Sequence, residues 1–289
     1  MIFRYNGGKS KKQILEKIKS YFPKEYSEFR EPFVGGGSVF FSIPLNKKRW
    51  INDKDEDLIS VYSALKNRPN EFIFSCRAIE PPKENEDLAA SKESSHKKSK
   101  NKALYNLRLK KIFDEFVQNT SIDPALRYYF INRVVWAGRV RYDLPSRLYY
   151  SNPNGWNIVK TDKLEKAANA LRDTKITSLN YKELIDEPGE DVFIYADPPY
   201  YKNTLLAKTS QLYRYNFTIE DHVKLAEELT CCKHKVLLSY DNCDFIKKLY
   251  KNWNIFEEEW TYCGTSSSEE VKNKNKKKGK ELLISNYEI

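Results

Sequence analysis

One stretch of the chain decides the expected fold: residues 192–200, which read VFIYADPPY. Five apolar residues in a row are typical of a buried strand, and an acid, two prolines and a tyrosine follow directly. In an open α/β sheet the ligand crevice lies outside the carboxyl ends of the strands, so a ligand there would meet Asp197, Pro198 and Tyr200. Considered alone, this tetrapeptide is equally consistent with an ordinary turn, because Asp-Pro and Pro-Pro are common turn dipeptides.

A second motif lies nearer the N-terminus, at residues 31–41, and reads EPFVGGGSVFF. It predicts a strand end, a glycine turn and the start of a helix with Ser38 in its first turn. Glycines allow positive φ angles and a close approach to a ligand, and a helix start presents free backbone N–H groups. Phosphate signatures fail, since Phe40 stands where a dinucleotide fingerprint has its third glycine. The motif therefore favours a nucleotide-like ligand without phosphates, of which S-adenosyl-L-methionine is the common one.

Asp53 ends the next predicted strand, residues 49–53. It follows the glycine turn by about 20 residues, the spacing at which an acid binds ribose hydroxyls in nucleotide-binding α/β folds. The alternative is that Asp53 caps the amphipathic helix that follows, in which Leu58, Val61 and Leu65 share one face.

These motifs, together with the N-terminal residues 4–9 (RYNGGK), occur in the order found in the DNA adenine-N6 methyltransferases. The chain most resembles the group of that family in which the target-recognition segment lies between the cofactor motif and the catalytic motif. The resemblance covers nearly everything except about residues 68–102.

The resemblance implies a role for each matching residue. Phe33 would lie against the adenine of S-adenosyl-L-methionine, and Asp53 would bind its ribose. The residues implied to bind this cofactor are Tyr5, Lys9, Phe33, Gly35, Gly37, Asp53 and Asp197.

The implied catalytic residues are Asp197, Pro198 and Tyr200. Asp197 and the Pro198 carbonyl would accept hydrogen bonds from the target amine, and Tyr200 would stack on a flipped base. The implied reaction is direct, in-line transfer of a methyl group to N6 of adenine in double-stranded DNA, which leaves S-adenosyl-L-homocysteine. The alternatives are a methyltransferase of RNA or another amine, and an inactive DNA-binding relative.

The expected architecture is a Rossmann-like α/β fold, with a mostly parallel seven-stranded sheet, helices on both faces and a mainly helical insert. Residues 1–54 and 161–289 would form the catalytic domain, and residues 55–160 the target-recognition insert. Within the insert, the Lys/Ser-rich stretch 83–102 is interpreted as a flexible loop, and helices are expected at about 102–119 and 123–137. The segment 201–217 is expected to be a mobile loop.

The net charge of +10 suits a polyanionic partner such as double-stranded DNA. Arg139 and Arg141 are candidate readers of guanine edges, with phosphate contact or a surface ion pair as the alternative. Arg133 is a candidate phosphate ligand. Lys276 and Lys277 belong to a lysine run between residues 272 and 280, which is either a DNA-contacting hairpin tip or a solvated loop.

The five cysteines include no CxxC pair, and the three histidines lie far apart in the sequence, so no metal site is expected. We expect a reduced, cytoplasmic protein without a membrane span or signal peptide. A monomer is expected, with a separate restriction endonuclease as a possible functional partner.

Overall fold

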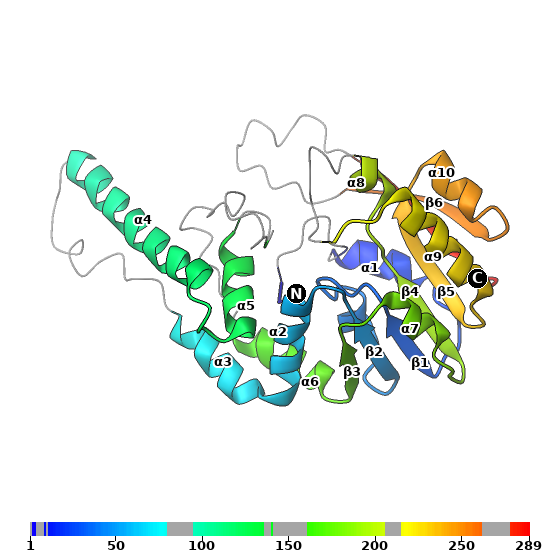
Figure 1. The fold of residues 1–289 in the computed structure, drawn as a ribbon, viewed down its shortest axis with the longest axis horizontal. Helices are drawn as coiled ribbons and strands as arrows, with labels where there is room; N and C mark the ends of the chain where they lie inside the picture. Colours follow the sequence, from blue (N-terminus) through cyan, green and yellow to red (C-terminus); the bar gives the residue numbers. More distant parts are fainter. Residues whose placement is uncertain are drawn as a thin grey trace. The chain divides into compact units, whose positions relative to one another are not determined.

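The structure, a computed structural model, describes residues 2–3, 9, 11–79, 95–135, 140, 161–205, 215–261 and 278–289 (Figure 1). The chain divides into two compact units. One, the sheet unit, comprises residues 5–59 and 170–289, and the other, the helical unit, comprises residues 60–169 with residues 2–4.

A single seven-stranded sheet forms the centre of the sheet unit, in the order β3-β2-β1-β4-β5-β7-β6. Neighbouring strands among β1 to β5 are parallel, and only β7 runs antiparallel to its neighbours β5 and β6. The predicted mostly parallel seven-stranded sheet is therefore confirmed. The strands are β1 (Glu28–Glu31), β2 (Lys48–Asn52), β3 (Thr174–Thr177), β4 (Val192–Ala196), β5 (Lys235–Asp241), β6 (Asn254–Thr261) and β7 (Lys278–Ser285).

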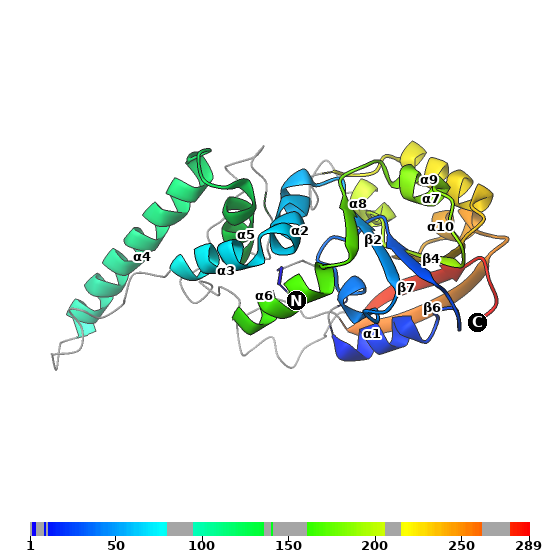
Figure 2. The same cartoon turned by 90° about the horizontal axis from the view of Figure 1, so that it is seen from below.

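Helices cover both faces of this sheet (Figure 2). On one face, α7 (Tyr181–Asp186), α9 (Ile219–Cys231) and α10 (Asp244–Leu249) bury apolar side chains against β4, β5 and β7. On the other face lies α1 (Lys12–Lys19), and Phe22, which follows it, packs against Phe193 with ring centroids 4.7 Å apart. Every residue of β4 is buried, as expected for a strand covered on both faces.

The helical unit contains most of α2 (Glu56–Asn67) and of α6 (Thr161–Leu171), together with α3 (Pro69–Ala78), α4 (Ser95–Gln118) and α5 (Pro124–Val134). Aromatic rings form much of its core. Phe3 lies 5.1 Å from Tyr62, and Phe116 lies 4.1 Å from Phe130, measured between ring centroids. None of the helices within the described ranges combines the length with the apolar composition that a membrane crossing requires.

Three sequence predictions are corrected by the structure. No α-helix begins at Ser38, because the glycine turn leads only to a short 3-10 helix, η1 (Phe40–Ser42). Residues 95–102, predicted as loop, belong to α4, while residues 83–94 lie outside the described residues. The segment after the predicted catalytic motif, residues 197–200, begins with α8 (Tyr201–Leu205) rather than a loop, and residues 206–214 lie outside the described residues.

Candidate active site at the carboxyl ends of the parallel strands

Four acids mark the carboxyl ends of four parallel strands. Glu31 ends β1, Asp53 follows β2, Asp197 follows β4 and Asp241 ends β5. The strand order reverses between the neighbours β1 and β4, since the chain proceeds outward from β1 to β2 and β3 and then returns to β4. Such a reversal opens a ligand crevice at the carboxyl ends of the two strands. Both sequence motifs therefore border the crevice that the topology creates.

The glycine turn is held closely against the end of β2. Gly35 and Gly37 have φ angles of 46° and 68°, which favour glycine because a Cβ would be strained there. The Gly35 N–H donates to Asp53 Oδ2 at 2.9 Å, and the Val34 N–H donates to the Asn52 carbonyl at 2.9 Å. The turn is thus held by its own hydrogen bonds and by Asp53, and only the short 3-10 helix η1 follows it.

Asp53 joins two segments of the site. Besides the bond from Gly35, its Oδ1 accepts the Asp55 N–H at 3.0 Å, just before α2. Asp53 is therefore not the N-cap of α2, because the helix begins at Glu56 and its first backbone bond goes to the Asp55 carbonyl. Burial raises the pKa of Asp53 to about 6, and the backbone hydrogen bonds offset part of this shift.

Asn52, which the sequence analysis did not single out, ties together three segments of the crevice. Its Nδ2 donates to the carbonyls of Pro32 and Leu179, each at 3.1 Å. Its Oδ1 accepts from Thr177 Oγ1 and from the Leu179 N–H, each at 2.8 Å. Three of these four bonds hold backbone atoms, at Pro32 and Leu179, close in sequence to Phe33 and Tyr181.

Phe33 belongs to a cluster of three aromatic rings. Its ring centroid lies 5.2 Å from that of Tyr181 and 5.8 Å from that of Phe217. All three rings are partly buried at the edge of the main core. Tyr181 and Phe217 were not predicted as site residues, because they come from the start of α7 and the segment before α9, far from Phe33 in sequence.

Lys9 contacts Asp197 of the predicted catalytic motif directly. Its Nζ lies 2.5 Å from Asp197 Oδ1 and 3.6 Å from Glu281 Oε2, and its side chain is only 3% exposed. Glu281 Oε2 also accepts from Ser239 Oγ at 3.2 Å. Burial disfavours the Lys9 ammonium, but the two carboxylates outweigh that effect and raise the pKa of Lys9 above its ordinary value. Lys9 is therefore a permanent cation beside Asp197.

Tyr200 lies in the same cluster. The Lys9 Nζ is 5.3 Å from the Tyr200 ring centroid, within reach of a cation–π interaction. The ring centroid of Tyr240 lies 6.2 Å from that of Tyr200. Pro198 is buried, whereas Asp197 keeps 31% of its side chain exposed. The structure thus brings together Lys9, Asp197, Pro198 and Tyr200.

Two buried oxygens in this region, Glu31 Oε2 and the Tyr195 hydroxyl, have no hydrogen-bond partner among the described residues. Burial, followed by the charge of Asp197, raises the pKa of Glu31 well above its usual range. Buried polar groups nearly always find a partner, so these oxygens fit a site that is completed by a bound polar ligand or by water.

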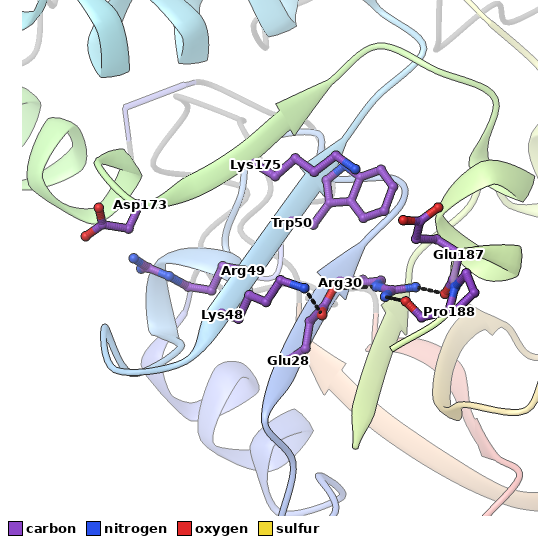
Figure 3. Close-up of a pocket in the computed structure, with 9 residues that line it drawn as sticks. All are labelled: Glu28, Arg30, Lys48, Arg49, Trp50, Asp173, Lys175, Glu187 and Pro188. Atoms are coloured by element: carbon purple, nitrogen blue, oxygen red, sulfur yellow. Dashed lines mark hydrogen bonds and ion pairs between the residues drawn. The ribbon is translucent and has the colours of Figure 1, made fainter. Parts of the chain in front are cut away.

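A separate small cavity of about 140 Å³ lies at the amino-terminal edge of the strands, beside Arg30 and Trp50 (Figure 3). There Arg30 donates to Glu28 Oε1 at 2.6 Å and to the carbonyls of Leu184 and Pro188 at 2.9 and 3.0 Å. Arg30 thereby holds β1 against α7 and the segment that follows it, which is a structural role.

The proposed DNA contacts are largely outside the described residues. This applies to Arg139, Arg141, Lys276 and Lys277, and also to the cofactor candidate Tyr5. Arg133 is described: it is 8% exposed, and its Nη1 donates to the Ile2 carbonyl at 3.4 Å. This intramolecular contact gives Arg133 a place in the core of the helical unit, and its contact with DNA stays a prediction.

Comparison with known proteins identifies the family. The sequence model of the D12 class N6 adenine-specific DNA methyltransferases matches residues 5–263. The chain belongs to this family. The family resemblance inferred from the motifs is thereby confirmed, and the protein is an adenine-specific DNA methyltransferase.

Relatives of this methyltransferase cover nearly its whole length. It is 27% identical to a type II methyltransferase of Lactococcus lactis subsp. cremoris, over 98% of this chain and 94% of the relative. A type II methyltransferase of Methanocaldococcus jannaschii is 29% identical over 87% of this chain and 88% of its own length. A DNA adenine methylase of Salmonella typhi is 26% identical, with 86% and 83% covered.

In this methyltransferase, no group of three or more potential metal ligands gathers within the described parts of the chain. The side chains that do gather at the crevice are carboxylates, one buried ammonium and aromatic rings. Such a set can hold an amine, a ribose and two flat bases.

Proposed function

We propose that this methyltransferase binds S-adenosyl-L-methionine at the ends of β1 and β2 and methylates N6 of an adenine flipped out of double-stranded DNA. The observation that carries the proposal is the cluster around Asp197, in which Lys9 fixes one carboxylate oxygen beside Tyr200. Asp197 follows β4, and the glycine turn follows its neighbour β1, so both belong to the ends of adjacent strands. Cofactor and target base would therefore meet at one carboxylate.

Each chemical group of this cofactor has a suitable residue in the crevice. The ring of Phe33, with Tyr181 and Phe217 beside it, offers a flat apolar surface for the adenine. The Asp53 carboxylate is an acceptor for the ribose hydroxyls, and the close approach of Gly35 and Gly37 leaves room for the chain of the methionine. Glu31 Oε2, buried and without a partner among the described residues, suits an ammonium group. Bound there, the cofactor supplies an electrophilic methyl group on a sulfonium.

The residues of the catalytic motif would then activate a poor nucleophile. The N6 lone pair of adenine is delocalised into the ring, so acceptors at the two N–H groups favour the pyramidal amine that attacks. Lys9 already bonds to Asp197 Oδ1, and we assign Oδ2 and the Pro198 carbonyl to the amine. In this scheme the N6–methyl bond would form as the sulfur–methyl bond of the cofactor breaks, and the amine would release one proton to water. In-line transfer of this kind requires mainly positioning.

Tyr200 would hold the extruded adenine by stacking, which offsets part of the cost of unstacking it from the duplex. The ring lies close to both Lys9 and Tyr240, and these contacts restrict its movement. Sequence choice would come from Arg139 and Arg141, and phosphate contacts from Arg133, Lys276 and Lys277. The names of the type II relatives support a restriction endonuclease as functional partner, and a monomer suffices for this scheme.

The test is methyl transfer from S-adenosyl-L-methionine to unmethylated DNA and to RNA of the same sequence, followed by nucleoside analysis. The proposal predicts N6-methyladenine in DNA alone, and none with Asp197→Ala. The matched control is Asp186→Ala, which removes an exposed acid paired only at the surface with Lys182. Methylated RNA, or cofactor binding without any transfer by the wild type, would contradict the proposal.

A further inference from the structure

Asp241 contacts the backbone directly behind the catalytic motif. Its Oδ1 accepts the Tyr201 N–H at 2.9 Å, and its Oδ2 accepts the Lys202 N–H at 3.2 Å. These are the first two N–H groups of α8, and they follow Tyr200 without an intervening residue. One carboxylate therefore accepts both backbone hydrogen bonds at the point where the Asp197–Tyr200 turn ends.

The position of Asp241 follows from the length of β5. The last residue pair between β4 and β5 joins Ala196 to Leu238, and Asp241 is three residues further along β5. At about 3.3 Å per residue, β5 continues roughly 10 Å past the end of its pairing with β4. The chain of β4 turns away at Asp197, so the extension of β5 runs alongside the catalytic turn.

The end of β5 is itself rigid. Asp241 pairs with Glu281 in the antiparallel ladder with β7, and the Asn242 N–H donates to the Lys280 carbonyl at 3.3 Å. Asp241 is 3% exposed, so its two hydrogen bonds are shielded from water. Hydrogen bonds to an ionised acceptor are about twice as strong as those between neutral groups.

The side chain of Tyr201 is fixed as well. Its ring stacks on Phe245 of α10, with centroids 4.4 Å apart and planes 20° apart, and lies 5.6 Å from the His222 ring. Both the backbone and the ring of Tyr201 are therefore held in place. A five-residue helix such as α8 has little stability of its own, so these contacts determine where the segment lies.

We propose that Asp241 is a positioning residue, which holds the end of the catalytic turn so that Tyr200 and Asp197 keep the geometry needed for methyl transfer. This inference rests on the proposed function of that turn. A misplacement of about 1 Å at a reacting centre can lower the rate by about 10²-fold. Asp241 acts through the backbone of Tyr201 and Lys202 and contacts neither the cofactor nor the base.

The test compares Asp241→Asn, which keeps the size of the side chain and one acceptor, with Asp241→Ala, which removes both acceptors. We expect kcat to fall about 10-fold and about 100-fold, respectively. The KM for S-adenosyl-L-methionine should stay within about 2-fold of the wild type, because a positioning residue acts on the transfer step. The matched control is Asp244→Asn, an exposed acid three residues further along the chain.

Two readouts separate positioning from mere stabilisation. A structural role would lower the melting temperature and leave kcat unchanged at temperatures where each variant is folded. Hydrogen exchange of the Tyr201 and Lys202 amides should accelerate in both variants and remain unchanged in Asp244→Asn. Wild-type rates in folded Asp241→Asn and Asp241→Ala would overturn this inference while leaving the proposed function intact. Absence of transfer by the wild type would instead overturn the proposed function.

Discussion

The Lys9→Met substitution probes the arrangement around Asp197 most sharply. Methionine has a length similar to lysine but no charge, so the buried ammonium between Asp197 and Glu281 disappears while most of the packing remains. Removing one partner of a buried ion pair typically costs 3–5 kcal/mol. Asp197 is 31% exposed, and solvent stabilises its charge in part, so we expect a loss of about 2–3 kcal/mol in unfolding free energy.

The same substitution should slow methyl transfer for a second reason. Without Lys9, the Asp197 carboxylate loses the donor that fixes Oδ1 at 2.5 Å, and its orientation toward the target amine is no longer set. We expect the single-turnover rate to fall on the order of 10²-fold. The assay is single-turnover transfer to DNA, together with thermal unfolding, with Lys12→Met on the exposed face of α1 as the control.

A double variant separates the two effects. Glu281→Gln removes the second buried charge, so Lys9→Met with Glu281→Gln should recover much of the lost stability. It should not recover the transfer rate, because Asp197 still lacks its donor. A wild-type transfer rate in folded Lys9→Met would refute the reasoning, and so would full recovery of the rate in the double variant.

Two further predictions concern Asp53 and Gly189. Because the pKa of Asp53 is raised from 3.8 to about 6, its ionisation disfavours folding, so its contribution to stability should decrease as the pH rises from 3.8 through 6. Affinity for S-adenosyl-L-methionine should show the opposite trend and weaken below pH 6, because the carboxylate that accepts from the ribose is protonated there. Titration calorimetry across this pH range should find no such dependence in Asp53→Asn. A wild-type pH dependence in that variant would contradict the assignment of Asp53. At Gly189 an added Cβ would lie 2.5 Å from Val192 Cγ2 and 2.6 Å from Arg30 Nη2. Gly189→Ala should therefore lower the unfolding free energy by about 2 kcal/mol, measured in a denaturant titration. The control Glu190→Ala, at the exposed residue next to it, should leave the unfolding free energy unchanged. Equal stability of the two variants would refute the steric argument.

The sequence predicted regular elements best where local signals agreed. β4 was predicted with its observed bounds, Val192–Ala196, because an apolar run ends there at an acid and two prolines. α9 begins at Ile219, and its start is likewise marked by neighbouring residues, since Thr218 and Asp221 form a reciprocal capping box there. Both elements are specified by residues that are neighbours in the chain.

The helix predicted from Ser38 failed because tertiary contacts and a proline override the local pattern. The positive φ angle of Gly37 and the bond from Gly35 to Asp53 shape the turn. Pro44 then disfavours helical backbone at the residue before it, Ile43, whose ψ angle is 139°. Only the 3-10 turn between these constraints remains.

The motifs predicted Asp53 and Asp197 as site residues, but the partners of Asp197 come from distant parts of the chain. The Lys9–Asp197 contact joins residues 188 positions apart, and strand order alone brings Glu281 beside them. Asp241 did carry a readable signal, since it is an acid at the end of an apolar strand, as Asp53 and Asp197 are. The same rule applied to β5 would have identified it.

The most direct test of the central claim is single-molecule mapping of N6-methyladenine in DNA from a methylation-deficient host that expresses this chain. The account predicts N6-methyladenine in one short sequence context with the wild type, and none with folded Asp197→Ala. Modification at that context by Asp197→Ala at the wild-type level, or no N6-methyladenine with the wild type, would contradict it.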